Sequence, residues 1–221
     1  MTWALQSNIN LQLPYDEIGI LVSWQTCYWF LAHRFTEENS GMKDQEKYVA
    51  FLRGINLGKR NIKMAELAQV FAKLGCEQVL TVLASGNVIF LSTAELTQEQ
   101  IQQALQDEFG FEISVVIRSI SHLQSLIEKS PFADYEGKND VKFYATFSDH
   151  SIGNILEEVT GIEGDFDLVQ VREYEYFCVA FKQATGRFGA GLSDLEKLFK
   201  HQIITTRNWN TVLKIIKKSN D

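Results

Sequence analysis

The chain has 221 residues, of which 45% are hydrophobic and 22% charged, and its formal net charge at pH 7 is −7. These values are ordinary for a soluble globular protein with one large domain or two small ones, and the negative charge argues against nucleic-acid binding over the whole surface. The three cysteines, Cys27, Cys76 and Cys178, are widely spaced and form no Cys/His cluster, which argues against structural zinc and fits a reducing compartment.

Residues 1–41 differ in character from the rest of the chain. They hold three of the four tryptophans and show no sustained helical or strand periodicity. Their most apolar stretch, Ile18 to Ala32, is interrupted by polar residues and is short for a membrane span, so no membrane association is expected. We expect residues 1–41 to be an N-terminal extension outside the fold, with Met42 as the natural start. Mass spectrometry of the native protein tests this expectation.

From Lys47 the pattern predicts a strand, a helix, a hairpin, a second helix and a fourth strand. Thr97 and Gln100 form a capping box, and the turn Ser85-Gly86 joins the two hairpin strands. The expected strands are 47–55, 78–83, 87–92 and 112–118, and the expected helices are 64–74, 97–109 and 121–129. The order β-α-β-β-α-β is that of a ferredoxin-like unit, here followed by an extra helix.

The same order of elements recurs in the second part of the chain. The expected strands are 141–147, 166–172, 174–182 and 202–206, and the expected helices are 151–160, 193–200 and one that begins near Trp209. Ser193 and Glu196 have the spacing of a second capping box. The sequence therefore predicts an α+β protein with an internal duplication, in which two ferredoxin-like subdomains, 42–140 and 141–221, follow one another in tandem.

Two of the predicted strands are apolar on both faces, namely Tyr48–Leu52 and Tyr176–Phe181. A sheet covered by helices on one side only should alternate between apolar and polar residues. We therefore expect the second face of each strand to be covered, either by the other half of the chain or by a partner subunit.

The loop after the first strand is the first candidate for a binding site. It carries Arg53 and several glycines and cations just before a helix, an arrangement that favours anion binding. The spacing from Gly54 to Lys59 is one residue too short for a Walker phosphate loop, and Arg60 replaces the magnesium-binding Ser or Thr. The loop could hold an anion in a nest of backbone N–H groups, or its glycines could serve backbone geometry alone.

Two later segments carry polar residues in less specific patterns. The segment Thr205–Thr211 is rich in polar and aromatic residues, and Asn208 or Asn210 is expected to cap the last helix. The glycine-rich segment Thr185–Gly191 could bind an anion but fits a flexible connector better. No spacing typical of a metal site or of a catalytic nucleophile is present, so no cofactor or metal is expected and no catalytic residue is assigned.

Three ordered segments together resemble the bacterial family called domain of unknown function (DUF) 1697. They are YVAFLRGINLG (48–58) running into Lys63, SGNV (85–88) with Phe90, and TRNWNT (206–211). The resemblance implies a cytoplasmic α+β protein made of two ferredoxin-like subdomains, and it brings no established activity. Ala84 departs from the polar residue expected before the SGN turn, and residues 1–41 lie outside the resemblance.

Three functions remain open at this point. The first is binding of a small anionic ligand, with or without catalysis, where the two halves meet. Its expected lining residues are Arg53, Asn56, Lys63, Ser85, Asn87, Arg207 and Asn210. The second is binding of RNA or a single strand through exposed aromatics, for which Tyr48, Phe51 and Phe90 are candidates. The third is a structural or oligomerising role, in a monomer or a homodimer, with the motifs holding the two halves together.

Overall fold

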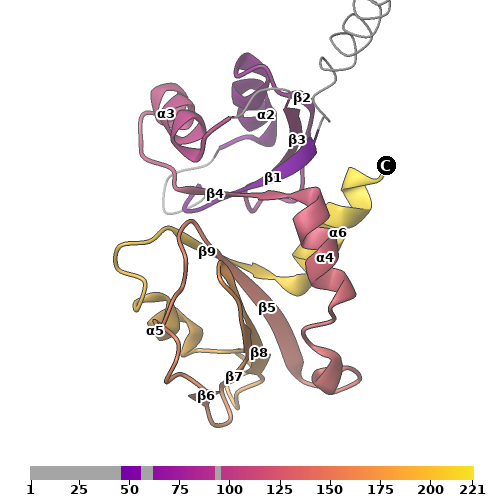
Figure 1. Cartoon of the computed structure of the whole chain (residues 1–221), viewed down its shortest axis with the longest axis vertical. Coiled ribbons are helices and arrows are strands. Elements are labelled where there is room, and N and C mark those ends of the chain that lie inside the picture. Colours follow the sequence, from indigo (N-terminus) through magenta and orange to yellow (C-terminus); the bar gives the residue numbers. More distant parts are fainter. Residues whose placement is uncertain (1–45, 56–61, 93–95) are drawn as a thin grey trace, which may run out of the picture. The chain divides into compact units, whose positions relative to one another are not determined.

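The computed structural model describes residues 46–55, 62–92 and 96–221, which all lie in one compact unit, Asp44–Asp221. They form a mixed α/β structure with two antiparallel sheets (Figure 1). The prediction about residues 1–41 lies outside these described residues. Among the described helices, none is both long enough and apolar enough to cross a membrane.

The first sheet has the strand order β2-β3-β1-β4. Its elements and the helices that accompany it are β1 (Glu46–Leu52), α2 (Met64–Lys73), β2 (Glu77–Thr81), β3 (Asn87–Ser92), α3 (Gln98–Phe109), β4 (Val115–Ser119) and α4 (Ile120–Glu128). Each agrees in type and approximate position with the pattern in the sequence. The capping box of α3 is confirmed, because Gln100 N donates to Thr97 Oγ1 while Thr97 N donates to Gln100 Oε1.

The second sheet has the strand order β6-β7-β8-β5-β9. Its elements are η1 (Ala133–Tyr135), β5 (Val141–Ser148), β6 (Gly161–Ile162), β7 (Phe166–Val171), β8 (Glu175–Phe181), α5 (Leu192–Glu196), β9 (Ile204–Asn208) and α6 (Trp209–Ser219). Asn208 caps α6 by accepting a hydrogen bond from Asn210 N at 3.0 Å, as one of the two alternatives predicted.

The predicted helix over 151–160 is wrong, because residues 153–158 form successive turns. Gly153 has φ +52°, outside the helical region, and Gly161 has φ +129°. Only Ile152 and Leu156 of this segment are buried against the second sheet. Two apolar contacts are too few to offset the low helix propensity of Gly153 and Asn154.

The second capping box is also wrong. Helix α5 begins after Gly191, with no side-chain cap, and Ser193 Oγ donates to Ala190 O instead. Glu196 is turned away from the start of the helix, toward Arg53 and Thr206. Tertiary partners therefore compete successfully for the carboxylate that a capping box would use.

A single apolar cluster joins the inner faces of the two sheets with helices α4 and α6 (Figure 1). It contains Val49 and Phe51 of β1, Phe147 of β5, and Phe177 and Val179 of β8. The rings of Phe51 and Phe147 stack with their centroids 4.7 Å apart and their planes 7° apart. Burial of each such side chain contributes about 1.5–3 kcal/mol, so this cluster is a major source of stability.

Separate clusters cover the outer faces of both sheets. Helices α2 and α3 pack on the first sheet around Ala50 and Leu52, while α5 and the turns before β6 pack on the second around Tyr176. Strands β1 and β8 are therefore buried on both faces, as their sequences predicted. The cover on the inner faces comes from the other half of the same chain.

The turn between β2 and β3 requires glycine at position 86. Gly86 has φ +76°, and a Cβ atom there would lie 2.8 Å from Ile55 Cδ1 and 3.1 Å from Leu52 Cβ. The turn thus approaches the end of β1 so closely that no side chain fits. This contact brings Ser85 and Asn87 next to the residues that end β1.

Candidate functional site

Arg207 on β9 bonds to three segments of the chain, and we call it and its partners the Arg207 cluster. Its Nε donates to Asn87 Oδ1 at 2.8 Å, its Nη1 to Thr206 O at 3.0 Å, and its Nη2 to Leu52 O at 2.6 Å. Nη2 also lies 3.5 Å from Ser85 O. The partly buried guanidinium therefore ties the second sheet to the end of β1 and to the turn before β3.

The environment of Arg207 is that of a partly buried structural cation. Desolvation by burial, followed by the nearby positive charge of Arg53, lowers the pKa of Arg207 to about 10, while Glu196 opposes the change. The side chain remains charged at neutral pH. Its guanidinium lies over the ring of Phe51, with Cζ 5.5 Å from the ring centroid.

Asn87 is fully buried and is held by hydrogen bonds on both ends of its amide. Its Nδ2 donates to Val82 O and to Ser85 Oγ, each at 2.9 Å, while its Oδ1 accepts from Arg207. Three of the residues predicted to bind a ligand, Ser85, Asn87 and Arg207, are thus brought together here, but Asn87 and Arg207 direct their polar atoms to one another and to backbone carbonyls.

A second arginine makes a matching set of contacts in the opposite direction, and we call it and its partners the Arg118 cluster. Arg118 on β4 donates from Nε to Glu175 Oε1 at 2.7 Å and from Nη2 to Ser148 O and Tyr174 O at 2.6 and 3.0 Å. The exposed fractions of the two ionic side chains are 13% for Arg118 and 3% for Glu175. His122 Nε2 lies 3.0 Å from the same carboxylate oxygen.

Strand register shows that the two clusters occupy corresponding places. Arg118 faces Val49 in β1, and Arg207 faces Ala145 in β5. The guanidinium of Arg118 lies over the ring of Phe147 in β5, with Cζ 5.7 Å from the ring centroid, just as that of Arg207 lies over Phe51 in β1. Phe51 and Phe147 each stand two residues after the strand residue that faces an arginine. The hydrogen-bond partners also correspond. Arg207 bonds to Asn87 at the start of β3 and Arg118 bonds to Glu175 at the start of β8. Arg207 bonds to the carbonyls of Leu52 and Thr206, and Arg118 bonds to those of Ser148 and Ile117.

Thr205 offers a test of how closely the two halves correspond. It faces Phe147 in β5, and Val116 holds the matching place opposite Phe51 in β1. Thr205 Oγ1 is the buried side-chain polar atom without a hydrogen-bond partner in the described part of the chain. Thr205→Val should therefore raise the free energy of unfolding by about 1 kcal/mol.

Urea denaturation measures this change in unfolding free energy. Thr206→Val is the matched control, because Thr206 Oγ1 donates to Glu196 Oε1 at 2.6 Å and contacts Thr146 Oγ1 at 2.8 Å. That control should lower stability. Equal losses in the two variants would contradict the account of Thr205.

Arg53 is an exposed cation beside the Arg207 cluster. Its Nη1 donates to Ile204 O at 2.9 Å and its Nη2 to Glu196 Oε2 at 3.0 Å. The side chain of Arg53 is 49% exposed and that of Glu196 is 25% exposed. Arg53 is thus more exposed than Arg207 and presents part of its guanidinium to solvent, at the boundary between the two sheets.

Glu196 continues this contact into the second sheet through hydroxyl groups. Thr206 connects it to Thr146, and the pKa of Tyr176 is raised chiefly by burial, with hydrogen bonding to Thr146 among the opposing effects. The corresponding positions of the first sheet are Ile117, Ala50 and Val88, which are all apolar. The polar network formed by Glu196, Thr206 and Thr146 therefore has no counterpart at the matching positions of the first sheet.

The other predicted site residues have different surroundings. Lys63 is exposed and pairs with Glu66 at 3.4 Å, and Asn210 is exposed in the first turn of α6. Ser85 is exposed and lies beside Asn87. Asn56 lies outside the described residues, as do Gly58, Lys59 and Arg60. No described contact joins Lys63 or Asn210 to Arg53.

The glycine-rich segment before α5 holds an anion that belongs to the chain itself. Ala190 N and Gly191 N donate to the two carboxylate oxygens of Asp165 at 2.8 and 2.6 Å. A Cβ at Gly191 would lie 2.7 Å from Asp165 Oδ2. These N–H groups are therefore occupied.

Two further features bear on the alternatives. Phe51 and Phe90 are buried, and Tyr48 stacks on Phe90 with 5.8 Å between centroids, so these aromatics offer no open stacking platform for bases. Cys76 and Cys178 are free and buried, and burial raises the pKa of Cys76 to about 11 and that of Cys178 to about 12. Both thiols are packing groups.

Sequence reasoning missed the two carboxylates that organise the region, Glu175 and Glu196. Glu175 stands at the start of an apolar strand, and only this position indicates that it is buried. Glu196 has the spacing of a capping-box residue, so its sequence position gives no sign of a tertiary role. Their roles depend on partners 57 and 143 residues away. A charged residue inside an apolar strand pattern was the one signal that could have singled out Glu175.

Comparison with known proteins gives a family and a fold. The family described as "Protein of unknown function (DUF1697)" matches residues 45–176. A conserved bacterial protein, SP0830 from Streptococcus pneumoniae, has a solved structure that matches with TM-score 0.59 and 24% identity over 80% of this chain and 99% of that one. This likeness bears on the fold alone.

A second solved structure is an unknown protein from Galdieria sulphuraria, with TM-score 0.21 and 13% identity over 74% of this chain and 98% of that one. That similarity is too low to carry an argument. The search of curated proteins found no match.

Proposed function

The chain belongs to the DUF1697 family of proteins of unknown function, and we propose that it binds a small ligand carrying a phosphate or carboxylate group at Arg53, between its two sheets. The observation that carries this proposal is the half-exposed guanidinium of Arg53, which pairs with one carboxylate, Glu196, and lies near a second cation, Arg207. An anion placed at Arg53 would meet two positive charges and one negative charge.

Arg53 is also chemically suited to this role. Its planar guanidinium can bind two oxygens of a phosphate or carboxylate at once, and Glu196 shows that an anionic group fits against Nη2. Ser85 belongs to the Arg207 cluster and is exposed, so its hydroxyl could orient the ligand. Asn87 and Arg207 would act as the frame of the site.

The alternative that the motifs serve structure alone is favoured by a specific observation. Every nitrogen of Arg207 donates to a protein acceptor, which is what a structural role requires. The two roles can coexist, because Arg53 and Arg207 differ in exposure. The structural role is tested through Arg207, and ligand binding is tested through Arg53.

We further propose that the two sheets represent a tandem duplication of a ferredoxin-like unit, in subdomains 42–140 and 141–221. Support comes from the common strand order, β2-β3-β1-β4 and β7-β8-β5-β9, and from the matching arginine clusters. We also propose a cytoplasmic location, which the family resemblance implies and which suits two free, buried thiols.

Arg53→Gln tests ligand binding directly. In thermal unfolding with inorganic phosphate, pyrophosphate and a panel of dicarboxylates, the parent protein should gain stability from at least one anion. A ligand at 100 times its dissociation constant adds about 2.7 kcal/mol, which raises the melting temperature by roughly 5–10 °C for a chain of this size. Arg53→Gln should abolish that rise.

The matched control is Lys73→Gln, since Lys73 is an exposed cation that pairs with a carboxylate, Glu108, at 2.6 Å. It removes the same charge from a surface outside the proposed site and should keep the full response. If both variants respond like the parent, the anion binds elsewhere and the proposal fails.

A further inference from the structure

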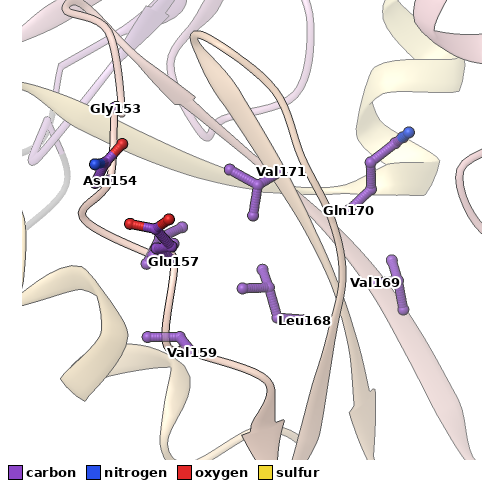
Figure 2. Close-up of a pocket in the computed structure, with 9 residues that line it drawn as sticks. Gly153, Asn154, Glu157, Val159, Leu168, Val169, Gln170 and Val171 are labelled. Atoms are coloured by element: carbon purple, nitrogen blue, oxygen red, sulfur yellow. The ribbon is translucent and has the colours of Figure 1, made fainter.

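An open groove lies on the outer side of the second sheet, between the turns at 153–159 and strand β7 (Figure 2). Its volume is about 410 Å³. Leu168 and Val171 direct their side chains toward the turns, whereas Val169 and Gln170 point away (Figure 2), and Val159 and Glu157 line the groove from the side of the turns. The groove thus combines an apolar floor with one acidic group.

The groove exists because the second half lacks a helix that the first half has. In the first half the segment after the first strand forms α2, which packs beside β2 and buries Phe71 completely. In the second half the corresponding segment forms turns that bury only Ile152 and Leu156. Space therefore remains above β7.

Strand β7 has a free edge beside this groove. The two-residue strand β6 pairs only with Phe166 and Asp167, and Leu168 N donates to Thr160 O. Beyond Leu168, no strand in the described part of the chain pairs with that side of β7. Because Arg172 N bonds inward to Glu175 O, the N–H and C=O of Val171 point outward, as alternate residues of a strand do.

Negative charge surrounds the groove. Residues 153–175 contain seven Asp or Glu residues and one Arg. Three of the acids are engaged inside the fold, namely Asp165, Asp167 and Glu175. Glu157, Glu158, Glu163 and Glu173 are exposed, and no ion pair of Glu157 occurs among the described residues.

We propose that this groove docks an extended segment of a basic partner polypeptide, which adds as a strand to the free edge of β7. The backbone of the segment would bond to the outward N–H and C=O of Val171, and a Lys or Arg side chain would lay its apolar stem over Leu168 and Val171 and its charge against Glu157. Added strands gain affinity from main-chain hydrogen bonds and specificity from side-chain pockets. Opposite charges speed and orient the encounter.

If the features beside β7 served only to prevent other chains from pairing with its free edge, the surface there would differ from the one observed. Proteins protect free edges with bulges and charged side chains, and the irregular register between Leu168 and Gln170 is of this kind. Val171 and Ile155, however, are 40% and 37% exposed, which leaves apolar surface beside the edge. Protection favours charges at such positions, whereas docking requires apolar ones.

Fluorescence anisotropy with the full-length protein tests the proposal. The probe is a labelled, end-blocked peptide of alternating Lys and Val, and the two comparison peptides replace its Lys with Glu or its Val with Pro. The Lys-Val peptide should bind, and the Lys-Pro peptide, of equal charge but fewer backbone donors, should bind at least about tenfold more weakly. The Glu-Val peptide should not bind.

Two variants of equal charge locate the site. Glu157→Lys should weaken binding of the Lys-Val peptide by about tenfold or more, whereas Glu158→Lys, next to it but outside the groove lining, should change it less than about threefold. Equal effects of the two variants, or equal binding of the Lys-Pro peptide, would show diffuse attraction to an acidic surface and overturn the proposal. If free N-acetyl-lysine amide displaced the labelled Lys-Val peptide when added at the same concentration as that peptide, strand addition would also be overturned.

Discussion

Arg207→Leu should lower the free energy of unfolding by about 3–5 kcal/mol, a large fraction of the stability of an ordinary domain. The substitution leaves the fully buried Asn87 without the donor to its Oδ1 and leaves Leu52 O without Nη2. Buried acceptors that lose their donors carry a desolvation cost that leucine cannot repay. Urea denaturation followed by tryptophan fluorescence measures the loss, because Trp209 lies in the shared apolar cluster.

Arg207→Lys separates geometry from charge. Lysine keeps the positive charge but lacks the planar group that reaches Asn87, Thr206 and Leu52 together. We expect the unfolding free energy of Arg207→Lys to lie between that of the parent and that of Arg207→Leu. A loss below about 1 kcal/mol for Arg207→Leu would mean that the cluster contributes little, and it would return Arg207 to the group of candidate ligand residues.

The sequence predicted elements well wherever the determining signal is local. Apolar residues at helical spacing located α2, the Thr97 capping box located α3, and a glycine turn located the β2–β3 hairpin. The apolar character of β1 on both faces also predicted a covered sheet, because each residue of a strand reports the face that it occupies. These signals act within a few residues along the chain.

The prediction failed where distant partners decide the conformation. Glu196 has the spacing of a capping residue but bonds to Arg53, which is 143 residues away. Arg207 and Asn87 were expected to line one ligand site, and in the structure they are hydrogen-bonded to one another although they are 120 residues apart in the chain. Residue types alone could not show that their polar atoms would satisfy one another, since an arginine beside an asparagine suits ligand binding and structural bonding equally well.

Glu175→Gln should lower the free energy of unfolding at neutral pH by about 1–3 kcal/mol, and the difference from the parent should vanish in acid. Burial raises the pKa of Glu175, but the hydrogen bond of His122 and the charge and hydrogen bond of Arg118 outweigh it, so the pKa is lowered overall. A lowered pKa means that the folded state binds this proton more weakly than the unfolded state. The stabilisation is therefore complete above the unfolded value of about 4.3 and is lost as the pH falls through the folded value.

The asymmetry of the two arginine clusters makes this prediction specific. Arg207 bonds to the neutral amide of Asn87, whereas Arg118 bonds to a carboxylate, so only the Arg118 cluster should respond to acid. Unfolding free energies in urea at pH 7, 5, 4 and 3 should converge for the parent and Glu175→Gln. Glu108→Gln, which removes an exposed carboxylate paired with Lys73, should stay within about 0.5 kcal/mol of the parent throughout.

Removing the whole ion pair distinguishes a net stabilising contact from one that merely avoids an unpaired charge. Arg118→Met alone leaves Glu175 almost fully buried with His122 as its remaining side-chain partner, and Glu175→Leu alone leaves Arg118 without its carboxylate. Each single change should cost about 3–5 kcal/mol, while the double variant should cost clearly less than the sum. Additive losses would show that the two side chains stabilise the fold independently, with no net coupling between Arg118 and Glu175.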